Sequence, residues 1–304
     1  MKIAVQTGGM SERFGVEETY KLIRESGFEG ADANLDHVFN PGEVRRKSIP
    51  ELLLNYSDET FFEFFKPWRD GAAKYGVENV QAHSVFPGWL PGGDSEYNDF
   101  LLDLQKKMIR ASAFIGCRRL VIHPFFGTYD SPLPAEEEFR LNLESYSALA
   151  DTAKECGVII CLENMFVVHR GKAYAACCSD IGIACELIDA LNERAGERRF
   201  GFCLDTGHIL LTGTDIFSAM VRLGDRIEAF HIHDNNGIGD QHLAPYMGVL
   251  DWTRFTDGLK AIGFDKPISF ETFNIWNTVD PEVAPAMLKF IAETGKMFVR
   301  KAMS

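Results

Sequence analysis

The sequence predicts one α/β domain over residues 1–304, a single (β/α)8 TIM barrel. Short β-rich runs alternate with longer helical stretches along the whole chain, and eight such runs are present. Parallel neighbours need a crossover helix between them, and eight parallel strands close a barrel. The main alternative, an open doubly wound sheet, loses support because no GxGxxG fingerprint follows the first run.

The expected strands are β-rich runs that helical stretches or turn signals separate. In chain order they are Met1–Gln6, Gly30–Asn34, Asn79–His83, Arg118–His123, Val158–Glu163, Arg199–Asp205, Ile227–Asp234 and Pro267–Thr272. Helical patterns follow the third to the eighth strand, at Tyr97–Phe114, Pro134–Cys156, Asp180–Arg194, Ile216–Leu223, Asp251–Ile262 and Pro281–Val299. The Gly- and Pro-rich piece Pro87–Gly93 is expected to be a loop, and no linker or tandem repeat divides the chain.

Composition and charge narrow the class of protein. Hydrophobic residues make up 46% and charged residues 25%, as in an ordinary soluble globular protein. The formal net charge of −13 disfavours a nucleic-acid partner and suits a metal site. The start of the chain lacks the apolar region of a signal peptide, and no apolar run reaches the ~18 residues of a membrane span. We therefore expect a cytoplasmic protein with no membrane partner.

Seven cysteines are present, and none forms a CxxC pair. Several lie inside apolar runs, which predicts buried free thiols in a reducing compartment. The adjacent pair Cys177 and Cys178 leaves a redox-active role open.

A polar, ligand-type residue stands at or near the C-terminal end of each expected strand from the third to the eighth. These residues are His83, His123, Glu163, Asp205, His231 and Glu271. Barrel enzymes build their sites at that end of the barrel. Strand side chains alternate between faces, so Ser269 and Glu271 should point into the barrel while Phe270 points to the helices. His231 and His233 should likewise share one face.

Crowding several carboxylates together requires protons or a cation to compensate their charge. A divalent ion held by Glu163, Asp205, His231 and Glu271 meets that need. Oxygen and imidazole ligands without thiolate suit Mn²⁺, Mg²⁺, Co²⁺ or Zn²⁺. A lone His or Glu at a strand end is usually a structural hydrogen-bonding residue, but six at successive strand ends favour a site.

Three local motifs refine this hypothesis. In Leu162-Glu163-Asn164 an amide could orient the carboxylate, and in Asp205-Thr206-Gly207-His208 the glycine is expected to allow a tight turn that brings His208 over the site. In the loop after the seventh strand, Asp240 and His242 predict a second metal subsite or a substrate contact; the alternative is a solvated loop.

At these residues the chain resembles the xylose-isomerase-like barrel superfamily of sugar isomerases, epimerases and apurinic endonucleases. The motifs that carry the resemblance are Ile122-His123-Pro124, Leu162-Glu163-Asn164, Asp205-Thr206-Gly207-His208, Phe230-His231-Ile232-His233-Asp234 and Phe270-Glu271-Thr272. The resemblance covers nearly the whole length of the chain. Together these motifs are strong evidence for the superfamily and weak evidence for any one substrate.

The resemblance to ketose 3-epimerases implies a role for several residues. It implies that Glu163, Asp205, His231 and Glu271 hold the metal, and that the two glutamates also act as acid and base. The residues expected to contact substrate are His83, His123, His208 and His233. An Arg that those epimerases use six positions after the ligand His falls here on Gly237, which departs from their pattern.

The apurinic endonucleases hold three metals, and every residue type of their ligand pattern is matched. The matching positions are His83, His123, Glu163, Asp205, His208, His231, Asp240, His242 and Glu271. This similarity keeps open a metal phosphodiesterase and more than one bound ion. The acidic balance and the lack of Arg- or Lys-rich loops after the strands weigh against DNA.

The sequence thus favours a metal-dependent isomerase or epimerase of a small sugar or sugar-like polyol, with a carbohydrate as its small-molecule partner. Proton abstraction next to a metal-polarised carbonyl would give an enediolate. The alternatives are an inosose-type dehydratase on the same site, an endonuclease-like phosphodiesterase, or a barrel that binds metal without catalysis. Trp89, Phe125, Phe166 and Trp252 could wall the site or pack in core and loops. Dimers or tetramers are common in the resembling group, so a homo-oligomer is a further expectation.

Overall fold

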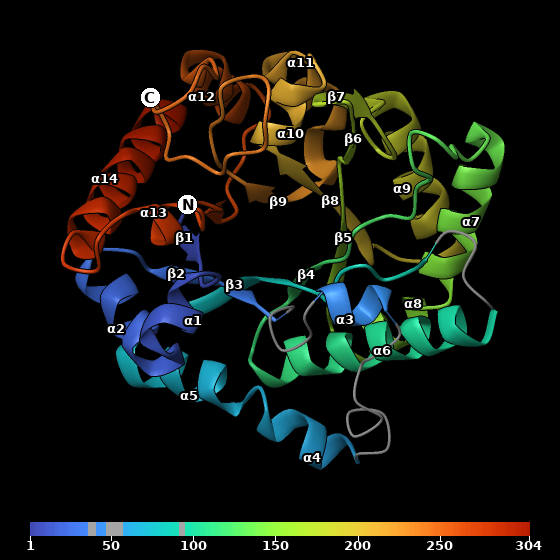
Figure 1. The fold of residues 1–304 in the computed structure, drawn as a ribbon, viewed down its shortest axis with the longest axis horizontal. Coiled ribbons are helices and arrows are strands. Elements are labelled where there is room, and N and C mark those ends of the chain that lie inside the picture. The colour runs from blue at the N-terminus through green and yellow to red at the C-terminus, as the bar shows by residue number, and fades with distance from the viewer. Residues whose placement is uncertain (36–40, 47–56, 91–94) are drawn as a thin grey trace.

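The structure, a computed structural model, describes residues 1–35, 41–46, 57–90 and 95–304. Eight parallel strands form a nearly closed barrel, and helices surround it (Figure 1). The predicted (β/α)8 barrel is therefore confirmed. The last residues of the expected loop Pro87–Gly93 lie outside the described part of the chain. No helix in the described ranges combines the length and the apolar character needed to cross a bilayer.

The barrel strands follow one another round the sheet in the order β10-β1-β2-β3-β4-β5-β8-β9. Their bounds are β1 Ile3–Gln6, β2 Gly30–Asn34, β3 Glu78–His83, β4 Arg119–Val121, β5 Ile159–Glu163, β8 Phe200–Asp205, β9 Ile227–His231 and β10 Ile268–Phe270. A bridge between Ile232 and Phe270 joins the two outer strands. Ile232 N donates to the Ser269 carbonyl at 2.9 Å, and Glu271 N donates to the Ile232 carbonyl at 3.0 Å. These bonds bring the ends of β9 and β10, which carry His231 and Glu271, side by side.

Helices connect the strands on the outside of the barrel. Their bounds are α1 Met10–Phe14, α2 Val16–Glu25, α3 Pro41–Arg45, α4 Asp58–Glu63, α5 Lys66–Tyr75, α6 Ser95–Phe114, α7 Ala135–Ser147, α8 Ala150–Cys156, α9 Ile181–Ala195, α10 Thr206–Leu211, α11 Ile216–Leu223, the 3-10 turn η3 Gly224–Arg226, α12 Trp252–Ala261, α13 Ile275–Thr278 and α14 Ala284–Met303. Asp180 and Asp251, which open two of the expected helices, are N-caps whose carboxylates accept from backbone N–H groups of α9 and α12.

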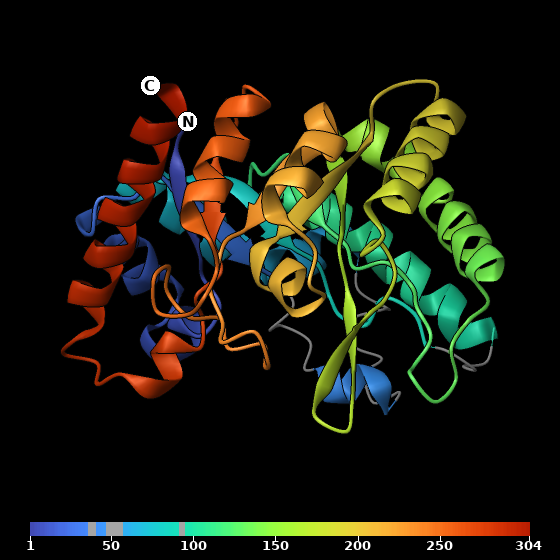
Figure 2. The same cartoon turned by 90° about the horizontal axis from the view of Figure 1, so that it is seen from above.

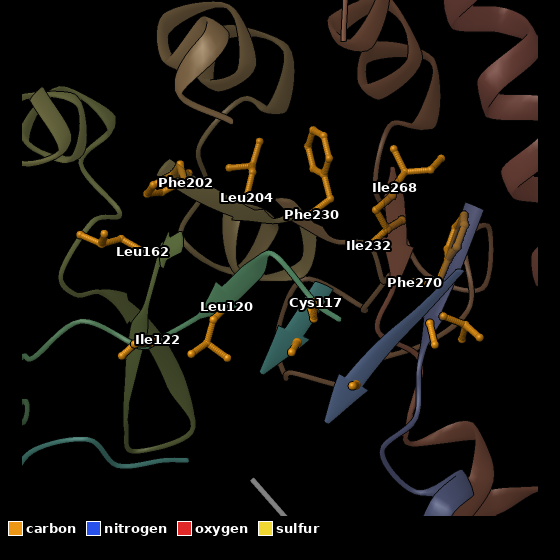
Figure 3. Close-up of a cluster of buried hydrophobic side chains, with 14 of the residues drawn as sticks. Cys117, Leu120, Ile122, Leu162, Phe202, Leu204, Phe230, Ile232, Ile268 and Phe270 are labelled. Carbon is orange, nitrogen blue, oxygen red and sulfur yellow. The ribbon is translucent and has the colours of Figure 1, made fainter. Parts of the chain in front are cut away.

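The strands separate two packed regions. The outward side chains, such as Leu204, Phe230 and Ile268, point to the helices and belong to the main hydrophobic core (Figure 3). The inward face of the barrel carries a small cluster of buried residues, which consists of Val121, Cys161, Cys203 and Ala229. The predicted alternation of faces is therefore confirmed. All seven cysteines are free, as expected, and five of them are buried.

An ion-pair network occupies the amino-terminal mouth of the barrel. The Glu228 side chain is buried, and its Oε1 lies 2.6 Å from Arg198 Nη2 and 3.0 Å from Lys266 Nζ. Arg119 Nε lies 3.3 Å from the other carboxylate oxygen. Since charged side chains fill this mouth, the opposite end, where the strand C-termini lie, is the open one.

Two features differ from the sequence-based expectation. The expected helix Pro134–Cys156 is two helices, α7 and α8, because the chain tightens at Leu149, whose N–H bonds the Tyr146 carbonyl three residues back. A β-hairpin, β6 Phe166–His169 and β7 Lys172–Ala175, follows β5 and was not predicted. Its turn residues, Arg170 and Gly171, both have positive φ, as in a type I′ hairpin turn. Figure 2 shows the hairpin extending beyond the strands.

Candidate metal and substrate site

A deep cavity of about 1210 Å³ opens at the C-terminal ends of the strands. Seven of the predicted site residues line it, namely His83, His123, Glu163, His208, Asp240, His242 and Glu271. Three others, Asp205, His231 and His233, are fully buried and do not line it. The structure thus brings the predicted residues together: seven of them face the cavity, and three are buried and do not line it.

The four residues expected to hold the metal form one compact group. Each offers a ligand atom, and these atoms lie within 4.8 Å of one another. His231 Nδ1 lies 3.1 Å from Glu163 Oε1, 3.5 Å from Glu271 Oε2 and 3.9 Å from Asp205 Oδ2. All four side chains are buried. Three carboxylates and one imidazole that converge in this way fit a divalent ion of the oxygen- and nitrogen-binding kind.

The pKa shifts in this group indicate that, without a metal ion, protons bound to some of its residues compensate the negative charge of the carboxylates. Burial, with help from Asp205 and Glu163, raises the pKa of Glu271 to about 8. Burial lowers the pKa of His231, but the neighbouring Cys203, Glu271 and Glu163 outweigh it, so this pKa is well above its usual value. Burial also raises the pKa of Glu163, yet the charges of His231 and His123 outweigh it, so this pKa is well below its usual value.

These pKa directions predict that metal binding releases protons. Near pH 7 the metal-free protein holds protons on Glu271 and His231, and a metal ligand must lose its proton. Because binding releases protons that the metal-free protein holds, metal affinity should rise with pH between pH 6 and pH 8, by about tenfold per pH unit for each proton released. Calorimetric titration with Mn²⁺ in buffers of different ionisation enthalpy measures the protons released. An affinity that does not change over this pH range would contradict the assignment.

A second ligand group stands next to the first and shares Glu163 with it. His123 Nε2 lies 3.0 Å from Glu163 Oε2, and His83 Nε2 lies 2.9 Å from His123 Nε2. His83 Nδ1 donates to the Ser84 carbonyl at 2.8 Å, which leaves Nε2 directed at the group. Burial and the charges of His123 and His231 lower the pKa of His83 to about 3, so its imidazole is neutral, as a metal ligand must be.

A third group lies around Asp240 and includes His208, His233 and His242. His242 Nε2 lies 2.8 Å and His208 Nε2 lies 3.7 Å from Asp240 Oδ2. The Nδ1 of His208 donates to the Asn164 carbonyl at 2.8 Å, and that of His242 donates to the Glu271 carbonyl at 3.1 Å. Backbone carbonyls on one ring nitrogen commonly orient a histidine whose other nitrogen binds metal. The structure thus brings Asp240 and His242 together with His208, with His242 buried and Asp240 exposed, and a second metal subsite at these residues stays a prediction.

His233 has a different place from the one that the sequence suggested. It is fully buried behind Asp205, and its Nε2 lies 3.0 Å from Asp205 Oδ1, so it cannot reach the cavity as an expected substrate contact should. Asn164 also differs from expectation: it does not orient Glu163, because its amide pairs with the backbone N–H and carbonyl of Asp205, at 2.9 and 3.0 Å. Both residues therefore hold Asp205.

Gly207 makes room for His233 and does not form the expected tight turn. It lies inside α10, where Asp205 is the N-cap and accepts from His208 N at 2.7 Å. This cap, not a glycine turn, brings His208 over the site. A Cβ on Gly207 would lie 1.9 Å from His233 Cε1. Only a residue without a side chain fits there while His233 keeps its contact with Asp205.

Gly207→Ala should therefore destabilise the fold by about 1–3 kcal/mol, because the buried His233 ring must move. Metal affinity should fall too, since Asp205 loses its partner. Urea unfolding with and without Mn²⁺ measures both effects. Gly239→Ala is the matched control, because a Cβ there meets nothing within 4 Å. Equal unfolding midpoints for the two variants would show that the His233 contact is not needed.

Sequence reasoning missed Asp32, which lies in the middle of β2 on the inner face of the barrel. It is fully buried, and its Oδ2 accepts from Gln81 Nε2 at 2.7 Å and Ser269 Oγ at 3.2 Å. The same oxygen lies 3.6 Å from His231 Nε2, the nitrogen that faces away from the ligand group. Burial raises the pKa of Asp32 to about 6. An acidic residue between two alanines of an expected strand was the available signal.

Aromatic rings surround the polar floor of the cavity. Each of three phenylalanines packs on a site histidine, with ring centroids 4.7 Å apart for Phe86 and His123, 4.8 Å for Phe166 and His208, and 4.0 Å for Phe273 and His242. All three rings line the cavity. This collar surrounds the imidazoles with apolar groups, and a less polar surrounding strengthens electrostatic interactions at the floor.

Of the four aromatic residues considered as walls, Trp89, Phe125 and Phe166 line the cavity. Trp252 does not: it is 3% exposed, its Nε1 donates to Asp234 Oδ2 at 3.0 Å, and it stacks on Phe298. Trp252 is therefore a core residue.

The arginine expected from the epimerase pattern is absent, since Gly237 occupies that position with a φ of +76°. Two other arginines, Arg13 and Arg45, line the cavity. Arg13 donates to the Val279 carbonyl at 2.9 Å, and Arg45 lies over the Phe86 ring. Within the described residues, the arginine side chains that line the cavity come from α1 and α3 and not from the loop after β9.

The barrel carries groups of ligand-type residues at its strand ends, and comparison with known proteins places the chain in a family. A model described as "Xylose isomerase-like TIM barrel" matches residues 18–294. The chain belongs to this family, which confirms the resemblance seen in the sequence. It is 28% identical over 255 residues to a probable endonuclease 4 of Mycoplasmopsis agalactiae, covering 80% of this chain and 82% of that protein.

Solved structures share the fold over nearly the whole length. D-allulose 3-epimerase from Methylomonas sp., in complex with D-allulose, superimposes with a TM-score of 0.70 and 17% identity, covering 99% of this chain and 97% of that one. The IOLI protein with a bound zinc atom superimposes with a TM-score of 0.66 and 18% identity, covering 99% and 98%. These solved structures show that the barrel fold is shared, and the sequence relatives of the chain include proteins named as epimerases and as endonucleases.

Proposed function

We propose that this protein is a divalent-metal-dependent isomerase or epimerase of a small polyhydroxy carbonyl compound. The observation that carries the proposal is the placement of Glu163 and Glu271. Both line the cavity, they come from different strands, and they stand 3.1 and 3.5 Å from the same nitrogen, His231 Nδ1. Two carboxylates that meet at one buried point can act on a substrate between them.

The residues present fit a metal. Crowded carboxylates need a positive partner, and the ligand atoms of three buried carboxylates and His231 lie within 4.8 Å of one another. Glu163, Asp205, His231 and Glu271 would hold the ion. When bound, it would supply Lewis-acid polarisation of a substrate carbonyl, which stabilises the enediolate left by proton removal. Mn²⁺, Mg²⁺, Co²⁺ and Zn²⁺ all suit this donor set.

The chain's own residues would move the proton. Glu163 takes it from the carbon next to the carbonyl, and Glu271 returns it on the other side. Gln6 Nε2 donates to Glu271 Oε1 at 2.6 Å and fixes that carboxyl group. His83, His123 and His208 line the cavity and would hold substrate oxygens. The aromatic collar keeps water away from the carbon that has lost its proton.

Proton exchange tests this proposal most directly. Metal-loaded protein in D2O should introduce deuterium next to the carbonyl of a ketose, and NMR should detect loss of that proton signal. Chelation should stop the exchange, and re-addition of the metal should restore it. Absence of exchange across ketoses and inosose-type ketones, with metal bound, would overturn the proposal. Release of water from an inosose would instead identify the dehydratase variant, in which the same proton removal precedes loss of hydroxide.

A second candidate function, phosphodiester hydrolysis, is favoured by one observation: three ligand groups are assembled side by side. Multi-metal sites activate water and stabilise the leaving oxygen in phosphoryl chemistry. The net charge of −13 opposes a polyanionic substrate. Elemental analysis and an assay on duplex DNA with an abasic site separate the two functions. Three bound ions with strand cleavage would favour hydrolysis, whereas proton exchange without cleavage favours the isomerase.

A further inference from the structure

We propose a second subsite in the cavity, formed by Trp89 and Phe125, that binds a second sugar ring of the substrate. The substrate class would then be a ketose with a sugar attached at the end remote from its carbonyl. This inference rests on the proposed function, because that function places the carbonyl at the polar floor. It adds to the proposed function the class of larger substrate that the cavity would select.

The first observation is the size of the cavity. Its volume of about 1210 Å³ exceeds the range of roughly 300–1,000 Å³ that is usual for drug-sized ligands. A single monosaccharide would leave most of it filled with water. A two-ring substrate would use both the polar floor and the apolar walls.

The second observation is that the Trp89 and Phe125 rings do not support the site histidines. Their centroids lie 5.6 Å apart at 34°, and Phe125 has Tyr146 behind it at 6.0 Å. The collar phenylalanines, by contrast, pack directly on site imidazoles. Half-buried Trp89 is therefore the main ring of a separate aromatic wall of the same cavity, and Phe125, which is 8% exposed, lines the cavity beside it and supports it.

The third observation is that side-chain amides hold the backbone on both sides of this wall, from buried Gln105 and Asn142 and from half-buried Asn98. On the Trp89 side, Gln105 Nε2 donates to the Val85 carbonyl at 3.1 Å, and Asn98 Oδ1 accepts from Leu90 N at 3.0 Å. On the other side, fully buried Asn142 pairs with both the N–H and the carbonyl of Phe125, each at 2.7 Å. Rigidly held rings lose little freedom when a ligand binds, so they are suited to recognition.

The chemistry of an aromatic wall selects a sugar ring. A pyranose presents C–H groups on its face, and these match the negative face of an aromatic ring. No carboxylate of the three ligand groups belongs to the wall, so it adds apolar contact rather than charge. Because the carbonyl end must reach Glu163 and Glu271, the second ring has to be attached at the far end of the ketose.

The test compares D-fructose with 6-O-glucosyl-fructose (isomaltulose) by calorimetric titration of the metal-loaded protein. The second ring should tighten binding by about tenfold, given about 0.5–1.5 kcal/mol for an aromatic contact plus the area buried. Trp89→Ala should remove this advantage and leave fructose affinity unchanged. Trp89→Phe, which keeps a ring, should retain most of it.

Two results would overturn the subsite: equal affinity for both sugars in the wild type, or an advantage that survives in Trp89→Ala. If Trp89→Ala does not fold, the wild-type comparison and Trp89→Phe still decide, since loss of all advantage on retaining a ring would also contradict a stacking role. Failure of the proposed function looks different. In that case neither sugar exchanges deuterium, while Trp89-dependent binding persists.

Discussion

Glu163→Gln is expected to lower the rate of deuterium exchange about a thousandfold, within the 10²–10⁴ contribution typical of a positioned general base. Glutamine keeps the shape of the side chain but cannot accept a proton from carbon. It also replaces the carboxylate that two ligand groups share, so metal affinity should fall as well. Single-turnover exchange at saturating Mn²⁺ separates the loss of the base from the loss of metal.

Glu12→Gln is the matched control, because Glu12 lines the same cavity and belongs to no ligand group. It should leave the exchange rate within a few-fold of wild type. If Glu163→Gln exchanges protons as fast as wild type with metal bound, another group is the base. Glu271→Gln would then be the next variant to measure.

Asp32→Asn is expected to weaken metal binding by about 10- to 100-fold, the usual effect of changing a residue that orients a metal-binding histidine. The carboxylate facing His231 Nε2 favours a proton on that nitrogen and leaves Nδ1 free for the ligand group. An amide can donate to Nε2, which favours the other tautomer and puts the proton on Nδ1.

The same variant should not destabilise the metal-free fold at pH 8. The pKa of Asp32 is raised to about 6 by burial, so its charged form is disfavoured in the folded state. The stability that the protonated acid supplies is complete below the unfolded pKa and is lost as the pH rises through about 6. Asparagine has no proton to lose, so Asp32→Asn should equal or exceed wild type in urea unfolding at pH 8.

Weaker metal binding without a loss of stability in Asp32→Asn would show that Asp32 positions His231. Replacing a purely structural residue would instead lower the stability. Asp180→Ala provides the contrast, because Asp180 caps α9 and belongs to no ligand group. It should alter stability and leave metal affinity unchanged. Wild-type metal affinity in Asp32→Asn would rule out the proposed orientation of His231.

The strand ends were predictable because strand periodicity and chain order are local properties. Phe230-His231 and Phe270-Glu271 alternate apolar and polar residues, so the face of each polar side chain follows from the pattern. Parallel strands in sequence order then bring their C-terminal ends to one rim. The clustering of Glu163, His231 and Glu271 needs no further information.

The depth of each residue was not predictable in the same way. His231 and His233 share a face, but His231 joins the group of Glu163 and Glu271, whereas His233 contacts Asp205 from behind and belongs to the group around Asp240. The alternation of residues along a strand predicts the face to which each side chain points. It does not predict which residue of another strand that side chain contacts inside the closed barrel. Gly207 shows the same limit, because its role depends on the ring of His233, which comes from another strand.

The sequence by itself determined the barrel, the rim that holds the site, and the chemical type of its donors, since all three follow from periodicity, order and residue chemistry. Only the tertiary structure decided that Asp32 lies next to His231 Nε2, that Phe166 of the hairpin lines the cavity together with Trp89 and Phe125, and that the three ligand groups lie together. These depend on contacts between segments far apart in the chain. Closing the barrel creates such contacts, and no local pattern encodes them.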